Sequence, residues 1–307
     1  MKTYVFLLFV LFATMVSAQQ ATGQIVKINE LVEGTLLEAE SNPKDYLAIL
    51  VAEKGMTDRD GNQPMLKSNS LKKLAQALAQ DGISSFRYDK RILKLVEKNM
   101  LDEGSLRFDD LVADAIRIVN YFQNKGYSKI IVIGHDQGAL IGSIAASKTS
   151  VDKIITISGA GSTIDRVIVE KIKQEAPELA PSAEKAFEEM RQTGMAKQYD
   201  PALESIFRET IQPFIKSWMA YDPAEVLSKL DIPVLVINAK KDMQSLPIDA
   251  VNLTAKTPAA VVVAIPNMNH VLTDISDDNL ENGKSYNEPD RPLSPEMINT
   301  IKAFIKK

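Results

Sequence analysis

Short runs of apolar, mostly β-branched residues alternate along this chain with longer segments whose apolar residues recur at helical spacing. Such runs are typical of strands buried on both faces. Two further β-leaning runs, 24–29 and 35–40, surround a turn and predict an antiparallel pair at one sheet edge. The alternation predicts an α/β protein with a mainly parallel, doubly wound sheet. The apolar runs are 46–52, 83–88, 130–133, 153–158, 232–238 and 260–265.

Residues from 162 to about 227 differ from the rest of the chain. Glu, Lys, Ala, Met and Gln dominate there, and the strand pattern is missing. These residue types favour helices, so we expect a helical cap inserted between two strands of the sheet. Together with a closing helix at 295–307, the chain is expected to form a single domain over 19–307.

The first 18 residues have the pattern of a signal peptide. Lys2 provides a short basic start, an apolar run follows at 5–12, and the small residues at 16–18 form a cleavage site. The apolar run is too short for a comfortable membrane span. We therefore expect a protein that is exported to the periplasm or secreted, without stable membrane insertion after signal cleavage.

Composition narrows the range of partners. The net charge of −4 argues against nucleic acid or an anionic membrane surface, since either would need a basic patch. The absence of cysteine excludes disulfides, thiolate nucleophiles and thiolate metal ligands. Asp58, Asp60 and Asn62 alternate as in a calcium loop, but the glycine offset and the terminal glutamate do not fit. We expect a small-molecule substrate and neither a metal nor another cofactor.

The strand at 130–133 leads to the most informative segment, GHDQG at 134–138, which passes directly into a small, apolar helical segment. Strand, tight turn and helix are the context of the nucleophile elbow, G-x-Nuc-x-G. The central residue of an elbow has strained backbone, and a Cβ at either flanking glycine would crowd the strand against the helix. Asp136 is therefore expected above the carboxyl edge of the sheet, at the N-terminus of the helix.

Two further candidates follow later strands, in the chain order nucleophile, acid, histidine. Asp242 comes shortly after the strand at 232–238, and His270 comes shortly after the strand at 260–265. The chain has two histidines, and His135 belongs to the elbow itself, so His270 is the candidate base. We expect Asp136, Asp242 and His270 to occupy the positions of a catalytic triad.

These motifs resemble the α/β-hydrolase superfamily, most closely its secreted esterases and serine-aminopeptidase-like hydrolases. In that group the first loop commonly reads GSGPTDRDGN, and a YDKRG segment, a GHSxG elbow and an MNHVL-like histidine loop follow. The corresponding segments here are EKGMTDRDGN at 53–62, YDKRI at 88–92, GHDQG at 134–138 and MNHVL at 268–272. The resemblance covers essentially the whole mature chain. It implies an α/β-hydrolase fold and hydrolysis of a carboxylic ester or a related acyl substrate.

Three departures from the family pattern bear on the chemistry. Asp136 replaces the serine nucleophile, Glu53 and Lys54 replace small residues of the oxyanion loop, and Ile92 replaces a glycine. A serine attacks only when histidine takes its proton, whereas a carboxylate needs no proton removed. Asp136 is therefore expected to act in one of two ways, by attack through an anhydride or as a general base for water.

The resemblance also implies where a developing oxyanion would bind. In this fold the donors are backbone N–H groups of the residue after the nucleophile and of the first loop. By position they belong to Gln137 and to one residue among Glu53, Lys54 and Gly55. A larger loop side chain need not move its own N–H group, but it can block the pocket.

Two other functions stay open. An elbow aspartate suits displacement at saturated carbon, as in epoxide hydrolases and dehalogenases, with His270 then activating water to hydrolyse the ester formed on Asp136. Those enzymes usually have tryptophan where this chain has Gln137, and Tyr199 or Tyr221 in the cap could protonate an epoxide oxygen. The joint loss of the serine and of the small oxyanion loop instead suits a non-enzymatic binding protein that keeps the fold and the pocket.

Overall fold

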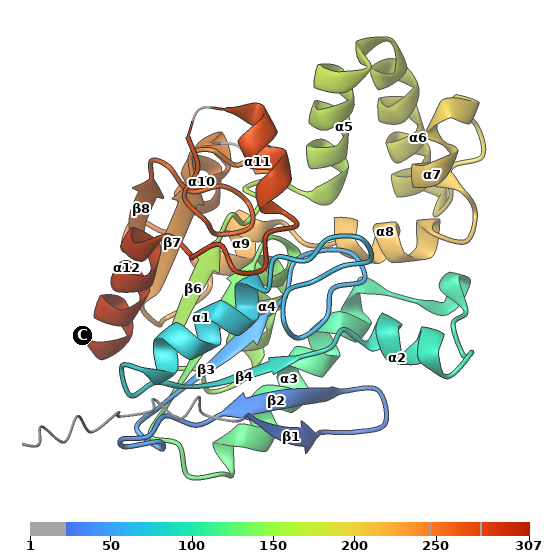
Figure 1. The fold of residues 1–307 in the computed structure, drawn as a ribbon. Helices are drawn as coiled ribbons and strands as arrows, with labels where there is room; N and C mark the ends of the chain where they lie inside the picture. Colours follow the sequence, from blue (N-terminus) through green and yellow to red (C-terminus); the bar gives the residue numbers. More distant parts are fainter. Residues whose placement is uncertain (1–22, 246, 277) are drawn as a thin grey trace, which may run out of the picture.

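The computed structural model describes residues 23–245, 247–276 and 278–307, so the predicted signal peptide, 1–18, lies outside the described residues. An eight-stranded sheet forms the centre of the molecule, in the order β1-β2-β4-β3-β5-β6-β7-β8 (Figure 1). Strands β1, β2 and β4 pair antiparallel at one end, and the remaining pairs are parallel. This confirms the predicted mainly parallel sheet. The strands are β1 (Gln24–Lys27), β2 (Glu33–Leu37), β3 (Tyr46–Val51), β4 (Ser84–Tyr88), β5 (Lys129–His135), β6 (Lys153–Ile157), β7 (Val234–Ala239) and β8 (Val261–Ile265).

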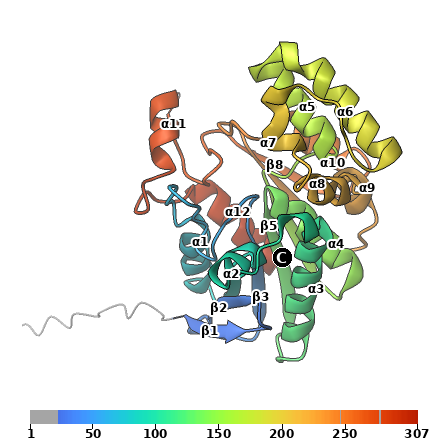
Figure 2. The same ribbon diagram turned by 90° about the vertical axis from the view of Figure 1, so that its right-hand side faces the viewer.

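Helices cover both faces of the sheet, as a doubly wound protein requires. Figure 2 shows α1 on one side of the strands and α3 and α4 on the other. Two separate apolar cores result, one beneath α1 and α12 and one beneath α3, α4, α9 and α10. The central helix α4 is buried along most of its length, because it lies between the sheet and α3. These helices are α1 (Ser70–Ala79), α3 (Phe108–Gln123), α4 (Gln137–Lys148), α9 (Pro223–Ser228), α10 (Pro247–Thr254) and α12 (Pro295–Lys306).

Between β6 and β7 the chain is helical throughout its regular structure. Helices α5, α6 and α7 stand away from the sheet (Figure 1) and enclose a small core of their own around Phe187, Met190 and Phe207. Helix α8 joins this unit to the sheet layer, because the ring of Trp218 stacks on Phe108 of α3 with 5.3 Å between ring centroids. The helices are α5 (Ile164–Glu175), α6 (Ala180–Thr193), α7 (Glu204–Phe207) and α8 (Gln212–Met219), with short 3₁₀ turns at Pro177–Leu179 and Pro201–Leu203.

Two helices were not predicted from the sequence. Helix α2 (Arg91–Glu97) buries none of its residues, and α11 (Asn279–Ser285) buries the polar residues Asn282 and Ser285. Helix α2 comes after β4 and α11 comes after β8, and a 3₁₀ turn at Glu103–Ser105 follows α2. Within the described part of the chain, none of the helices has the length and apolar character needed to cross a bilayer.

Candidate active site

The segment between β5 and α4 has the backbone of a nucleophile elbow. Asp136 lies between the strand and the helix with φ 50° and ψ −114°, in a region that L-residues rarely occupy. A Cβ at Gly134 would lie 2.2 Å from the carbonyl oxygen of Gly138, and one at Gly138 would lie 2.1 Å from that of Val51. Both contacts are impossible for real atoms, so each position requires glycine. The predicted strained elbow is thereby confirmed.

The side chain of Asp136 forms an ion pair with Lys54. Its Oδ2 accepts from the backbone N–H of Lys54 at 3.1 Å and from the Nζ of the same residue at 3.0 Å. Burial acts to raise the pKa of Asp136, but the Lys54 ammonium and the two nearby histidines hold it well below its usual range. Asp136 is therefore ionised, and its carboxylate rests on an N–H group expected to bind an oxyanion.

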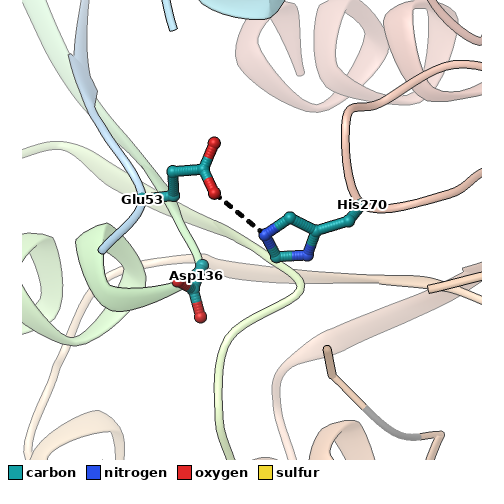
Figure 3. Close-up of side chains that lie close together, drawn as sticks. All are labelled: Glu53, Asp136 and His270. Carbon is teal, nitrogen blue, oxygen red and sulfur yellow. Dashed lines mark hydrogen bonds and ion pairs between the residues drawn. The ribbon is translucent and has the colours of Figure 1, made fainter. Parts of the chain in front are cut away.

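His270 lies between the carboxylates of Asp242 and Glu53, and Figure 3 shows the contact with Glu53. Its Nδ1–H donates to the Asp242 carboxylate, with 2.9 and 3.0 Å to the two oxygens, and its Nε2 is 3.2 Å from Oε2 of Glu53. Asp242 is itself held by the backbone N–H groups of Gln244 and Ser245. Glu53, Asp242 and His270 are all buried. The loops after β7 and β8 thus bring Asp242 and His270 together over the elbow, and Glu53 joins them from the loop after β3.

This arrangement favours the protonated form of the histidine. Burial alone would lower the pKa of His270, but the hydrogen bond to Asp242 and the charges of both carboxylates raise it to about 10. Although burial opposes the effect, the hydrogen bond with His270 lowers the pKa of Glu53 and that of Asp242. At neutral pH His270 is therefore an imidazolium that donates at both nitrogens. It is a proton donor in the resting site, which differs from the base expected from the sequence.

Lys90 is a site residue that the sequence analysis missed. It lies two residues after the end of β4, it is 4% exposed, and its Nζ donates to the Glu53 carbonyl and, at 2.7 Å, to Oε1 of Gln137. Burial lowers the pKa of Lys90 to about 8. Lys90 therefore ties the loop after β3 to the start of α4, the two segments expected to carry the oxyanion donors. The sequence signal that could have predicted this role is a lysine two residues after a buried strand.

Two acidic residues, one in the first loop and one after β4, hold the rest of that loop. The carboxylate of Asp58 accepts from the backbone N–H groups of Asp60 and Asn62, both at 2.8 Å. Arg59 forms an ion pair with Asp89, which also accepts from its backbone N–H at 2.9 Å. Gly55 has φ 86°, a conformation that glycine adopts without strain. These contacts fix the loop that carries Glu53 and Lys54.

Two cavities lie between this site and the cap. One of about 290 Å³ reaches Asp136 and is lined mainly by apolar residues of α4, α5 and α8, among them Leu140, Ile168 and Trp218. The other, of about 330 Å³, reaches Lys54, Gly55, Lys90 and Gln137. A small apolar substrate group would fit in the first cavity, next to Asp136.

The cap tyrosines lie elsewhere. The hydroxyl of Tyr199 donates to Glu204 at 2.8 Å, and that of Tyr221 donates to Asp109. Tyr199 and Tyr221 do not line either cavity beside Asp136. Neither tyrosine therefore lies beside Asp136, where the role of epoxide proton donor considered for them would require it.

The chain is similar in sequence and in structure to known esterases and other proteins of the same fold. The chain is 25% identical to the esterase EstD of Thermotoga maritima over 211 residues, which cover 64% of this chain and 46% of that protein. The chain thus matches less than half the length of this relative. Among solved structures, Est1E from Butyrivibrio proteoclasticus has a TM-score of 0.59 at 15% identity, covering 92% of this chain and 97% of Est1E. VinJ has a TM-score of 0.55 at 12% identity, covering 94% and 99%.

The sequence also matches a protein-family model. The model described as the alpha/beta hydrolase family matches residues 74–280, which include the elbow, Asp242 and His270. The sheet order, the elbow backbone and the placement of these loops agree with that match. The chain belongs to the alpha/beta hydrolase family.

Proposed function

We propose that this protein hydrolyses carboxylic esters with a small apolar group. The observation that carries the proposal is that an ionised carboxylate on the elbow, Asp136, lies within 4.8 Å of the imidazole of His270 and beside an apolar cavity. The similarity to the esterase EstD supports the same reaction. The proposal gives the positions of the triad to Asp136, Asp242 and His270.

In the mechanism that we propose, Asp136 acts as a general base. Its carboxylate takes a proton from water, and the water oxygen attacks the ester carbonyl carbon. The developing oxyanion binds the backbone N–H groups of Lys54 and Gln137 and the Lys54 ammonium. His270, held by Asp242, then donates its Nε2 proton to the leaving alkoxide as the ester C–O bond breaks. The proton on Asp136 returns to His270, so acid and alcohol leave and the site is restored.

Attack by Asp136 through an anhydride fits the resting site less well. An anhydride on Asp136 would have to be hydrolysed by a second water, and that water needs a base. With its pKa at about 10, His270 carries protons on both nitrogens at neutral pH and has no lone pair to offer. General-base catalysis by Asp136 uses both groups in the protonation state that they already have.

The test compares two esters that differ in their leaving group. The protein should hydrolyse both p-nitrophenyl acetate and ethyl acetate, and Asp136→Asn should reduce both rates by about 100- to 10,000-fold. His270→Ala should reduce the ethyl ester rate by more than the p-nitrophenyl rate, because p-nitrophenolate leaves without protonation. Tyr199→Phe, in the cap, is the control and should leave both rates unchanged. Wild-type rates no higher than buffer, or rates unaffected by Asp136→Asn, would contradict the proposal.

A non-enzymatic binding protein is the second candidate, and one observation favours it. In the resting site the carboxylate of Asp136 is bound by Lys54, and Nε2 of His270 is bound by Glu53, so both groups have partners within the protein. Small carboxylic acids that raise the melting temperature, combined with no turnover of either ester, would support this function.

Displacement at saturated carbon is distinguished from ester hydrolysis and from binding by measuring the intact mass of a His270→Gln variant. If the protein acts on an epoxide or a carbon–halogen bond, that variant should accumulate an ester on Asp136.

We further propose that the protein acts outside the cytoplasm. The support is the basic, apolar and small-residue pattern of residues 1–18. N-terminal sequencing of protein purified from its native cells should begin at Gln19. A mature protein that still begins at Met1 would contradict the proposal.

A further inference from the structure

Three side chains that could bind a metal ion meet at the carboxyl edge of the sheet. One carboxylate oxygen each of Glu53 and Asp136 and one ring nitrogen of His270 lie within 4.8 Å of one another. Figure 3 shows Glu53 and His270 pointing toward each other with Asp136 beside them. The residues follow three different strands, β3, β5 and β8, and Glu53 and His270 are buried. The fold therefore brings together two carboxylates and an imidazole.

We propose that Glu53, Asp136 and His270 bind one divalent transition-metal ion, with Zn²⁺ as the best fit. Zinc binds imidazole nitrogen and carboxylate oxygen at about 2.0–2.2 Å, and its catalytic sites have three protein ligands and an open fourth position. Here the fourth position would face the cavity beside Asp136. This inference goes beyond the proposed function, because a bound zinc ion would occupy the Asp136 carboxylate and the Nε2 of His270 and so exclude the metal-free mechanism described above.

The distances allow the coordination. Two ligand atoms of one tetrahedral zinc ion lie roughly 3.3 Å apart, given the bond lengths above. The Oε2 of Glu53 and the Nε2 of His270 are already 3.2 Å apart. Asp136 completes the set by rotating its side chain away from Lys54, and its 16% exposure at the cavity leaves room for that movement.

Asp242 provides the support that a metal-bound histidine needs. Metal-binding histidines commonly donate their other ring N–H to a carboxylate, which fixes the orientation of the ring. The Nδ1–H of His270 donates to Asp242 in this way, so Nε2 is directed at Glu53. The cation takes the position of the Nε2 proton, and Asp242 keeps its hydrogen bond. The same set of side chains thus includes both the ligands and the group that orients one of them.

Lys54 is the competitor for this site. Its ammonium group is 3.0 Å from Oδ2 of Asp136, so one cation already neutralises a proposed ligand. The side chain of Lys54 is 42% exposed, and its Nζ also donates to Oε1 of Gln244 at 2.6 Å, whereas the Nζ of Lys90 is buried against the Glu53 carbonyl and Gln137. Removing the charge of Lys54 should therefore strengthen metal binding, an effect that general damage to the fold would not produce.

The experiment measures Zn²⁺ binding by isothermal titration calorimetry, with protein that carries no histidine tag. Background binding is low because the chain has two histidines and no cysteine. Wild type should bind one Zn²⁺ per chain, and Asp242→Asn should weaken binding by about 10- to 100-fold. Glu53→Gln and His270→Ala should weaken it further. Lys54→Met should tighten it by about tenfold or more, whereas Lys44→Met, a similarly exposed lysine paired with Glu38, should have no effect.

Two results would overturn the inference. One is an absence of Zn²⁺ binding by both wild type and Lys54→Met. The other is unchanged binding by Glu53→Gln and His270→Ala when circular dichroism shows that both are folded. Binding is measured without substrate, so the proposed function is judged separately. Zinc binding by a protein that does not hydrolyse esters when metal-free would contradict that function alone, and hydrolysis without zinc binding would contradict this inference alone.

Discussion

Two adjacent parts of the site differ in how the protein holds their charges. The histidine group, defined as Glu53, His270 and Asp242, has side chains that are 10%, 0% and 0% exposed. The elbow pair, Asp136 and Lys54, has side chains that are 16% and 42% exposed. Both parts contain an ion pair at hydrogen-bonding distance, so exposure is the main difference between them.

This difference in exposure predicts different behaviour. Removing one partner of a buried ion pair leaves an uncompensated charge, which is strongly destabilising. A partly exposed pair is screened by water and contributes little to stability. The histidine group is therefore a fixed part of the fold, whereas the elbow pair can separate when a substrate or a cation enters. The site thus combines a rigid proton donor with a carboxylate that can be released.

The largest effect on stability is expected from Asp242→Asn. The change leaves the His270 imidazolium buried with Glu53 as its remaining carboxylate partner, so the free energy of unfolding should fall by about 3–5 kcal/mol at pH 7. Urea denaturation measures this value. Asp81→Asn, which removes a surface pair with Lys302, is the control and should cost less than about 1 kcal/mol. An equal loss of unfolding free energy in the two variants would contradict the claim that buried pairs contribute more to stability than exposed pairs.

The next effect is a dependence of stability on pH. The pKa of His270 is raised to about 10 in the folded protein, above its ordinary value. The stabilisation is therefore fully present below about pH 6.5 and is lost as pH rises through 10. Wild type should lose roughly 3 kcal/mol from this group between pH 7 and pH 10, as measured by urea denaturation.

Glu53→Gln sharpens that comparison. One of the two charges that raise the pKa of His270 is removed, so the loss of stability should be complete at a lower pH and be smaller between pH 7 and pH 10. Because lysines and tyrosines also titrate in this range, the informative quantity is the difference between the two proteins. Identical pH profiles would show that Glu53 does not set the ionisation of His270.

The smallest effect is expected at the elbow pair. Lys54→Met removes the ammonium from Asp136, but the exposed position of Lys54 limits the cost to about 1 kcal/mol or less. The same denaturation experiment measures it. A cost as large as that of Asp242→Asn would mean that the elbow pair is as much a part of the fold as the histidine group.

Local sequence patterns predicted the fold and the backbone of the site well. The glycines around Asp136 determine the elbow, and the positions of Asp242 and His270 follow from the strands that precede them. Each of these features depends on a few residues that are neighbours in the sequence, so it can be predicted from a single sequence. Helices α2 and α11 were missed because neither buries an apolar stripe that a periodicity could reveal.

The contacts between side chains could not be predicted in the same way. Glu53 and His270 are 217 positions apart, and motif spacing does not show that the Glu53 carboxylate turns toward the imidazole. The pairing of Lys54 with Asp136 and the position of Lys90 also depend on side-chain rotation and packing. The protonation state of His270 follows from these contacts. That is why the sequence indicated a base, whereas the contacts with Asp242 and Glu53 favour the protonated ring.

The central claim is that His270 is an imidazolium held between two carboxylates at neutral pH. Nuclear magnetic resonance titration of ¹⁵N-labelled histidine tests it directly, because the chain has two histidines and a His270→Ala variant assigns the signals. The account predicts that both ring nitrogens of His270 are protonated at pH 7 and that they titrate near pH 10. A neutral ring at pH 7, or a titration near the ordinary value of about 6.5, would contradict it.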